Sequence, residues 1–341
     1  MTEFKSETNK IEDVYQFKIE VPFDVKFVCV YLWNVGNKFV LFDAGLNMNN
    51  WDKIFFTSLQ KIGISIKNID YCIISHYHLD HIGLIKKFKR KNPDIKICMG
   101  TIEHEAFKWE TNSQNFKELE LEAKELSQQM VKFGITNKQG ERLVHWFTMW
   151  SNLRRYQKPD VLLSDNDEIC FDEGKKLKIM WTPGHSLGHI CVFDDDKKYL
   201  FSGDHILSRI TPHIGNFIVD PVNRKNYDFE NILDHYLKSL DKIDKLNPKL
   251  IFPSHQEIIF NPHERIIAIK EFHKNRLKEI SNLIKNNPLT PLRISQIHFG
   301  ESLDEINAYL ALSEVISHLI YLESQEKVHR IEKNGKILFI S

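Results

Sequence analysis

Three histidines and one aspartate fall within six residues of this chain, at His76, His78, Asp80 and His81. They follow an apolar run, residues 70–74, that is typical of a buried strand, and a helix start comes directly after them. In an extended loop, His76 and His78 point to the same side because side-chain direction repeats every two residues. Imidazole and carboxylate groups ligate zinc and similar metals. The spacing therefore predicts a metal site, against the alternative of a few surface histidines near a turn.

Three later segments place the same ligand types after strand-like runs. His185 stands in a Thr-Pro-Gly-His-Ser sequence, Asp204 in Ser-Gly-Asp-His, and His255 in Pro-Ser-His. In α/β folds, chemistry gathers at strand ends, where loops converge. With the first cluster these segments offer seven donors, a number that suits two metal ions sharing one carboxylate and a water. Two close cations favour hydroxide over water at neutral pH and stabilise an oxyanion, so the pattern predicts a hydrolytic site.

The motif HxHxDH, followed by TPGHS, SGDH and PSH, resembles the metallo-β-lactamase superfamily in residue type and order over about residues 15 to 260. The resemblance implies an α/β fold, an αββα sandwich with the site at one edge. It also implies how the ligands divide. By this resemblance the first metal would be held by His76, His78 and His185, and the second by Asp80, His81 and His255, with Asp204 bridging.

Details of the motifs narrow the branch of the superfamily that the chain resembles. True β-lactamases often place a cysteine where this chain has Asp204, so the aspartate indicates the glyoxalase II, lactonase and nuclease branch. Flavodiiron-type members have glutamate at the position of His78. About fifty residues separate Asp204 from His255, which is too few for the extra domain of the β-CASP group. Gln256 follows His255 where glycine is common in relatives, which alters the loop but leaves the ligand intact.

Strand and helix patterns alternate over the first part of the chain, which predicts a layered α/β core. Segments 25–32 and 38–42 predict a hairpin, and residues 51–62 predict a helix. We expect residues 1–262 to form the catalytic domain, interrupted by a charged, helix-rich insertion at about 101–158. Asp43, after the second of these strands, is expected mainly to cap a turn, with support of the metal site as the alternative.

The composition changes after residue 262, where three helical segments precede a β-hairpin around Asn334-Gly335. Residues 263–341 therefore predict a small α+β domain of winged-helix type, and they resemble the extension of the β-lactamase-like protein 2 group. Within the insertion, Trp146, Trp150 and Leu153 share one helix face with Phe147 beside it. We expect this face to be core, with an apolar substrate pocket as the functional alternative.

Bulk composition sets further limits. The chain has 341 residues with 46 basic and 46 acidic side chains, so no global positive field favours nucleic acid or an anionic membrane. The chain has five cysteines, an odd number, and no CxxC motif. We expect these cysteines to be reduced and buried as small apolar side chains, in a reducing compartment. The polar N-terminal residues lack the apolar segment of a signal peptide. We expect a cytoplasmic protein that does not interact with membranes.

The favoured function is a hydrolase with two divalent ions, zinc first and iron or manganese as alternatives, whose bridging hydroxide attacks the carbonyl of a small ester, thioester or lactone. Asp80 and Asp204 are its predicted catalytic carboxylates, and Asp80 would also accept a proton. Arg209 and His213 would either contact an anionic group of the substrate or serve the structure alone. His189 and His205 are expected to support or pack against the ligands.

Two other functions remain open. A metal-dependent (endo)ribonuclease acting on single-stranded RNA would need a basic track, which the balanced charge does not indicate. A DNA-binding regulator ranks last, because the candidate recognition helix, residues 304–324, contains no lysine or arginine. Nucleic acid is therefore the less favoured partner, after a small-molecule substrate. The C-terminal module could instead pack against the catalytic domain, shape the pocket or form a homodimer.

Overall fold

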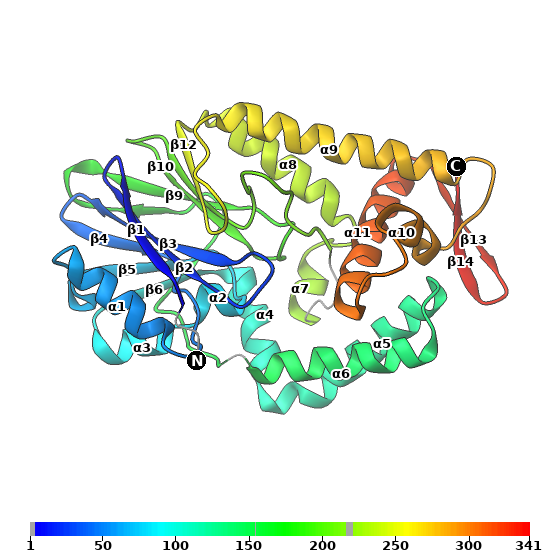
Figure 1. Ribbon diagram of the computed structural model, residues 1–341, viewed down its shortest axis with the longest axis horizontal. Helices are drawn as coiled ribbons and strands as arrows, with labels where there is room; N and C mark the ends of the chain where they lie inside the picture. Colours follow the sequence, from blue (N-terminus) through cyan, green and yellow to red (C-terminus); the bar gives the residue numbers. More distant parts are fainter. Residues whose placement is uncertain (1–3, 154, 216–220) are drawn as a thin grey trace. The chain divides into compact units, whose positions relative to one another are not determined.

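The computed structural model describes residues 4–153, 155–215 and 221–341 (Figure 1). The chain separates into two compact units. Unit 1 comprises Met1–His104, Gln157–Pro212 and Ser239–Ile266, and unit 2 comprises Glu105–Tyr156, His213–Lys238 and Ile267–Ser341. Unit 2 therefore includes most of the helical insertion as well as the C-terminal residues. The predicted domain boundary at residue 262 divides the chain along its sequence and stays a prediction.

Unit 1 contains two sheets. Over the described residues, the first has seven strands that pair in chain order, antiparallel up to β4 and parallel from β4 onward. These strands are β1 (Ser6–Ile11), β2 (Val14–Glu20), β3 (Phe27–Val35), β4 (Lys38–Phe42), β5 (Ile69–Ile74), β6 (Lys96–Gly100) and β7 (Val161–Leu163). The second has five strands in the order β12-β11-β10-β9-β8, with only the pair β11–β12 parallel. They are β8 (Glu168–Cys170), β9 (Lys176–Trp181), β10 (Ile190–Asp194), β11 (Tyr199–Gly203) and β12 (Leu250–Pro253).

The main core of unit 1 lies between these two sheets, because its buried cluster draws side chains from both. Phe201 of β11 stacks on Trp33 of β3 with ring centroids 3.9 Å apart, and on Phe252 of β12 at 5.0 Å. Tyr31 meets the edges of Phe201 and Phe252. These large rings bury much apolar area, so the face-to-face packing of the sheets is the main source of stability in unit 1.

Helices cover the outer faces. Phe55 of α1 (Trp51–Lys61) contacts Phe17 of β2 and Phe88 of α3 (Ile85–Lys91), which places both helices on the first sheet. Residues 239–245 of α8 (Ile232–Lys245) belong to the same unit and bury Leu240 and Ile243 completely. The predicted α/β architecture, with two packed sheets and helices outside them, is confirmed.

Three details differ from the sequence predictions. Strand β1 was not predicted, because its polar residues are nearly all exposed and carry no alternating pattern. The helix predicted to follow the histidine cluster begins inside it, because the short α2 (Leu79–Ile82) carries Asp80 and His81, and it is interrupted before α3, where the backbone of Gly83 lies against residues 45–47. Cys170 is exposed on the edge strand β8, whereas the other four cysteines are buried as expected.

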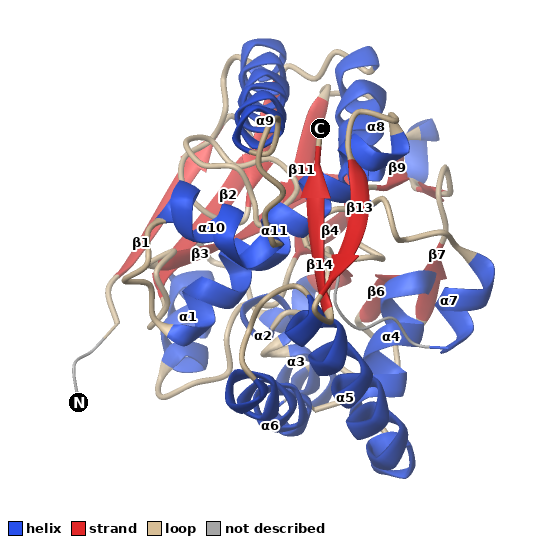
Figure 2. Cartoon of the chain, turned by 90° about the vertical axis from the view of Figure 1, so that its right-hand side faces the viewer, coloured by secondary structure: helices blue, strands red, loops and turns tan. Residues whose placement is uncertain are grey.

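Unit 2 is built mainly from helices around a second apolar cluster. Its elements are most of α4 (Thr101–Thr111), α5 (Phe116–Lys132), α6 (Asn137–Leu153), α7 (Pro221–Asn226), the first part of α8, most of α9 (Pro262–Leu283), α10 (Pro291–Phe299), α11 (Glu305–Ser324), β13 (His329–Lys333) and β14 (Lys336–Ile340). The predicted C-terminal hairpin is confirmed (Figure 2). Asn334 and Gly335 have φ of 52° and 69°, as the type I′ turn requires. The winged-helix assignment itself stays a prediction.

The aromatic residues of the insertion pack against this cluster. Trp146 and Phe147 of α6 contact each other and Tyr309 of α11. A mostly apolar cavity of about 120 Å³ lies beside Trp146. The core role that the sequence favoured is therefore observed for these two residues, while the side chains of Trp150 and Leu153 lie outside the described part of the structure.

Two buried histidines in unit 2 should make its stability depend on pH. His273 and His318 are fully buried and lie 3.1 Å apart through Nδ1 and Nε2. Burial and the charge of Arg276 lower the pKa of His273 to about 3, and burial also lowers the pKa of His318 well below its usual value. A histidine with a depressed folded-state pKa takes up a proton more readily when unfolded, so its stabilising effect is present above about pH 6.5 and lost as the pH falls.

We therefore expect each of the two histidines to lower the free energy of unfolding by about 1.4 kcal/mol per pH unit as the pH is lowered from 6.5 to about 5. Urea unfolding at several pH values, monitored by a signal from unit 2, measures this slope. His273→Gln should reduce it by roughly half. The exposed His329→Gln should leave it unchanged, and an equal effect of the two substitutions would rule the explanation out.

Candidate metal centre

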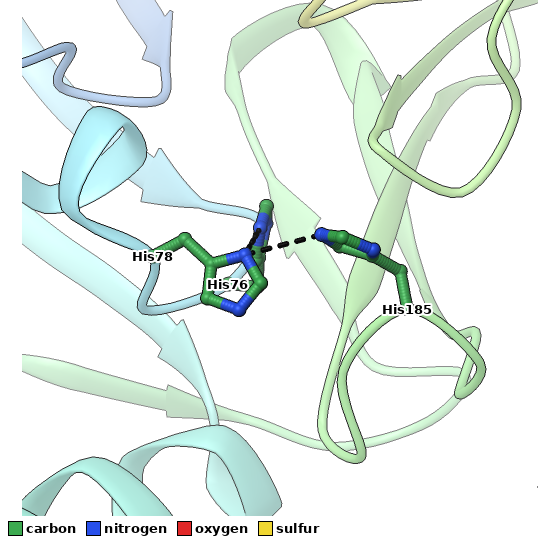
Figure 3. Close-up of side chains that lie close together, drawn as sticks. All are labelled: His76, His78 and His185. Atoms are coloured by element: carbon green, nitrogen blue, oxygen red, sulfur yellow. Dashed lines mark hydrogen bonds between the residues drawn. The ribbon is translucent and has the colours of Figure 1, made fainter. Parts of the chain in front are cut away.

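Three histidines from two loops converge on one point of unit 1 (Figure 3). His76 and His78 lie on the loop after β5, and His185 lies on the loop between β9 and β10. His78 Nδ1 is 2.9 Å from His76 Nε2 and 3.1 Å from His185 Nε2. His76 is buried, while His78 and His185 are half-buried. The sequence-predicted ligands of the first metal are therefore brought together, at the more accessible side of the site.

A second group combines Asp80, His81 and His255. Asp80 Oδ1 lies 3.7 Å from His81 Nε2, and its Oδ2 lies 3.4 Å from His255 Nε2. Asp80 and His81 stand on α2, and His255 follows β12 of the second sheet. All three are buried. These are the residues that the family resemblance assigned to a second metal.

Asp204, at the end of β11, lies between the two groups. Its Oδ2 is within 3.3–3.9 Å of the Nε2 atoms of four histidines, which are His76, His81, His185 and His255. The same carboxylate thus approaches members of both groups. This is the position that a bridging ligand would need.

The donor set fits two cations. Two nitrogens that each lie about 2.1 Å from a tetrahedral zinc are roughly 3.4 Å apart, a few tenths of an ångström more than the two separations in the three-histidine group. His81 Nε2 and Asp204 Oδ1 are buried and make no hydrogen bond. Buried polar atoms normally have a partner, and a bound cation would supply one to both. The residues present are nitrogen and oxygen donors, which zinc, iron and manganese all accept.

Charges within the site are strongly coupled. Burial lowers the pKa of His76 well below its usual value, so its imidazole is neutral and able to ligate. Burial alone would lower the pKa of His255, but the carboxylates of Asp204 and Asp80 outweigh it and raise the pKa to about 10. Burial would raise the pKa of Asp204, yet His255 and His81 hold it well below its usual value. Protons on His81 and His255 therefore balance the carboxylates, and cation binding should release protons.

Asp43 orients His81. Its Oδ2 accepts a hydrogen bond from His81 Nδ1 at 2.8 Å, so the Nε2 of that ring faces the other ligands. The carboxylate also accepts bonds from Ser75 N, Ser75 Oγ and Ser254 Oγ. Asp43 is completely buried. The expectation that this residue mainly caps a turn is wrong, since all of these contacts serve the metal-ligand loops.

We expect Asp43→Asn to weaken divalent-ion binding by the second group by about 10- to 100-fold, as loss of such outer contacts does in other metal sites. The amide cannot accept from all four donors and leaves His81 free to turn. Titration with Co²⁺ against a chromophoric chelator measures the effect. Asn9→Ala, on the exposed edge strand β1, is a suitable control, and an unchanged affinity in Asp43→Asn would contradict the role.

Other ligands are held in the same way. His76 Nδ1 bonds to Ser75 Oγ at 2.9 Å, and His255 Nδ1 donates to the carbonyl of Phe27 at 2.7 Å. His189 accepts from the backbone N–H of Asp204 at 3.2 Å and bonds to Thr182 through its other nitrogen. It therefore acts on the backbone that carries the bridging carboxylate, which agrees with the expected supporting role. His205 is fully buried, and burial lowers its pKa to about 3.

Glu103 was missed by sequence reasoning. It lies in the first turn of α4, is fully buried, and accepts hydrogen bonds from the loops that carry His78 and His185. A glutamate near a helix start is common on protein surfaces, so its type and position alone gave no signal of burial beside the site.

The two predicted substrate contacts, Arg209 and His213, belong to different units. Arg209 is exposed, and its backbone N–H donates to Gln256 Oε1 at 2.7 Å. Arg265 donates to the carbonyls of Leu207 and Ile210. Residues 207–210 are therefore held by both Gln256 and Arg265. His213 belongs to unit 2, where its Nε2 lies 2.8 Å from Ser313 Oγ. The substrate roles of Arg209 and His213 stay predictions.

Comparison with known proteins identifies the family of this chain. Residues 25–255 match the family described as the metallo-beta-lactamase superfamily, and residues 277–340 match the metallo-beta-lactamase-like C-terminal domain. The chain is 24% identical over 330 residues to the probable metallo-hydrolase YqjP of Bacillus subtilis, covering 96% of this chain and 98% of the relative. It is 28% identical to a beta-lactamase-like protein 2 homolog of Drosophila melanogaster, over 89% of this chain and 85% of the relative.

A solved structure of similar architecture is that of a metallo-beta-lactamase family protein from Thermus thermophilus. It has a TM-score of 0.75 and 22% sequence identity, and the match covers 97% of this chain and 99% of that one. Both family matches, the convergent ligands and the two packed sheets lead to one assignment. The chain belongs to the metallo-beta-lactamase superfamily and is a metal-dependent hydrolase.

Proposed function

We propose that this hydrolase uses two metal ions to cleave a small ester, thioester or lactone. The observation that carries the proposal is the position of Asp204, whose Oδ2 lies within 3.3–3.9 Å of histidine nitrogens from both ligand groups. A carboxylate placed in this way suits a pair of ions rather than one. Zinc is our first choice because the histidine-rich donor set suits it, and iron and manganese are the alternatives.

Two bound ions would supply a hydroxide nucleophile at neutral pH and positive charge for the developing oxyanion. The protein holds the donors for this chemistry rigidly, through Asp43 behind His81 and Ser75 behind His76. Asp80 is the candidate proton acceptor. Its carboxylate is mostly buried, and His81 and His255 offset the effect of burial and keep its pKa well below the usual value. It is therefore ionised at neutral pH, which a proton acceptor requires, although the low pKa makes it a weak base.

Substrate access should be from the three-histidine side. His78 and His185 are half-buried, whereas His76, His81, Asp204 and His255 are buried. The reacting carbonyl would thus meet the site beside His78 and His185. The four buried thiols among the cysteines suit a reducing compartment, so the cytoplasm stays our proposed location. None of the described helices is both long enough and apolar enough to cross a bilayer.

A second candidate is a nuclease acting on single-stranded RNA, and one surface feature favours it. Residues 51–96 hold nine Lys/Arg against four Asp/Glu, in a chain that is neutral overall. Lys86, Arg90 and Lys91 of α3 are exposed, and Lys91 lies over the ring of Phe56. Cations interleaved with an aromatic ring are typical of surfaces that bind single strands. Overall charge gave no indication of this local surface.

One experiment separates the two candidates. The protein reconstituted with Zn²⁺ is assayed on a glutathione thioester, an acyl-CoA, a lactone and a labelled single-stranded RNA, with Asp204→Ala as the inactive control. We expect cleavage of a carbonyl substrate that is lost in the variant. RNA cleavage that is lost in Asp204→Ala and weakened by Lys86→Glu with Arg90→Glu would reverse the ranking. Turnover by neither class, with two ions bound, would overturn both substrate assignments.

A further inference from the structure

A single buried carboxylate joins the two loops that form the three-histidine group. Glu103 Oε1 accepts a hydrogen bond from the backbone N–H of Tyr77 at 2.9 Å. Its Oε2 accepts from Ser186 Oγ at 3.0 Å and from the backbone N–H of Gly188 at 2.9 Å. The residue is 0% exposed. Both oxygens of one side chain are therefore used, one for each loop.

The bonded groups are immediate neighbours of the ligands. Tyr77 stands between His76 and His78, so fixing its N–H fixes the extended stretch that sends both rings to one side. Ser186 follows His185 directly. The two loops are more than a hundred residues apart in sequence, and His78 Nδ1 and His185 Nε2 meet across them at 3.1 Å. Glu103 thus ties together the backbones whose side chains must converge.

The backbone around Glu103 is shaped for this contact. A Cβ on Gly188 would lie 2.1 Å from Glu103 N and 2.6 Å from Glu103 Cα, and a Cβ on Gly100 would lie 2.9 Å from the carbonyl oxygen of Gly188. Glycine at both positions lets the end of the His185 loop pass directly over the first turn of α4. Side chains there would separate the loop from the carboxylate.

We propose that Glu103 is a positioning residue that sets the geometry of the three-histidine group, as Asp43 does for the other group. The inference rests on the proposed function, because it assumes that these histidines hold a metal ion. Hydrogen bonds to a carboxylate are stronger than neutral ones, and residues that orient ligands typically change metal affinity by about 10- to 100-fold when they are replaced. The effect should be confined to the group that Glu103 orients.

Two backgrounds separate the groups. In His255→Ala the three-histidine group is intact, and in His185→Ala the Asp80–His81–His255 group is intact. We expect Glu103→Gln to lower Co²⁺ affinity by about 10- to 100-fold in the first background, and by less than about threefold in the second. The visible absorption of bound Co²⁺ should also change in the first background only, because it reports ligand geometry.

Controls distinguish positioning from a general loss of structure. Asp194→Asn removes a different buried carboxylate of unit 1 and should alter neither affinity nor spectrum. Ser186→Ala removes one of the three bonds and keeps the carboxylate, so it should give a smaller effect of the same kind. It also serves if Glu103→Gln fails to fold, as judged from thermal unfolding without metal.

Equal losses in both backgrounds, or no loss in the His255→Ala background, would overturn the role of Glu103 while leaving two-ion binding by the unmodified protein intact. Absence of Co²⁺ binding by the unmodified protein would instead overturn the proposed function together with this inference. The two failures therefore have different signatures.

Discussion

Replacing Asp204 with alanine should lower kcat by about a thousandfold on whichever substrate the enzyme accepts. Its Oδ2 approaches histidines of both ligand groups, so the substitution removes the shared donor. It also removes the negative charge that balances the protons on His81 and His255. A buried site with fewer carboxylates binds cations less tightly. We expect the number of bound ions, measured by elemental analysis after dialysis, to fall from two to one or fewer.

A control for this prediction is Asp195→Ala, which removes an exposed carboxylate in the turn after β10 and should change neither kcat nor metal content. Asp204→Asn is also informative, because it keeps the shape but loses the charge, and it should resemble the alanine variant. An Asp204→Ala enzyme that keeps two ions and more than a tenth of its activity would show that the bridging role is wrong.

Truncating Phe201 to alanine should lower the free energy of unfolding of unit 1 by about 3–5 kcal/mol. This side chain is fully buried between the two sheets and contacts the rings of Trp33 and Phe252. Removing it leaves a cavity that rigid aromatic neighbours cannot fill. Urea unfolding followed by tryptophan fluorescence measures the change, since Trp33 lies at the altered position.

The exposed Leu162→Ala on β7 should cost less than about 0.5 kcal/mol, as surface substitutions usually do. A loss of under about 1 kcal/mol for Phe201→Ala would mean that the sheets can repack around the gap. That outcome would contradict the view that packing of the sheets is the main source of stability in unit 1.

The candidate ligands could be recognised in the sequence because each of them lies in a segment that follows a strand. His185, Asp204 and His255 each come after an apolar run ended by a short turn, and strand ends in one layer meet at one edge. How these candidate ligands divide between two ions came only from the resemblance to the metallo-β-lactamase superfamily. For such residues the sheet itself brings the strand ends together, so the local sequence pattern is sufficient to predict that they lie close in space.

Residues that act on the ligands were harder to predict. Asp43 was assigned to a turn because its bond to His81 joins segments 38 residues apart, and no local pattern encodes a contact of that kind. Glu103 is farther still in sequence from its partners, at 83 residues from Ser186 and 85 from Gly188. Buried polar contacts depend on how the sheets pack, which is a property of the whole unit rather than of any short segment.

Secondary-structure prediction failed where polar and apolar residues do not alternate in the sequence. Strand β1 pairs with β2 through its backbone while its side chains stay in solvent, so no alternation marks it. By contrast, the C-terminal hairpin was predicted because Asn334-Gly335 has the backbone preference that its turn requires. The limits of the compact units also depend on contacts far apart in the chain, and the change in composition after residue 262 does not reveal them.

The origin of the ligands has a consequence for synthesis of the protein. His76, His78, Asp80 and His81 follow β5 of the first sheet, whereas Asp204 and His255 follow β11 and β12 of the second. During translation, residue 255 must therefore emerge from the ribosomal exit tunnel before His255, the last donor, can reach the others. A nascent chain up to about residue 200 carries a complete HxHxDH motif but only part of the full ligand set. The full ligand set is thus completed only late in synthesis, and a rise in the zinc retained by arrested nascent chains as their length passes residue 255 would report that the two sheets have packed together.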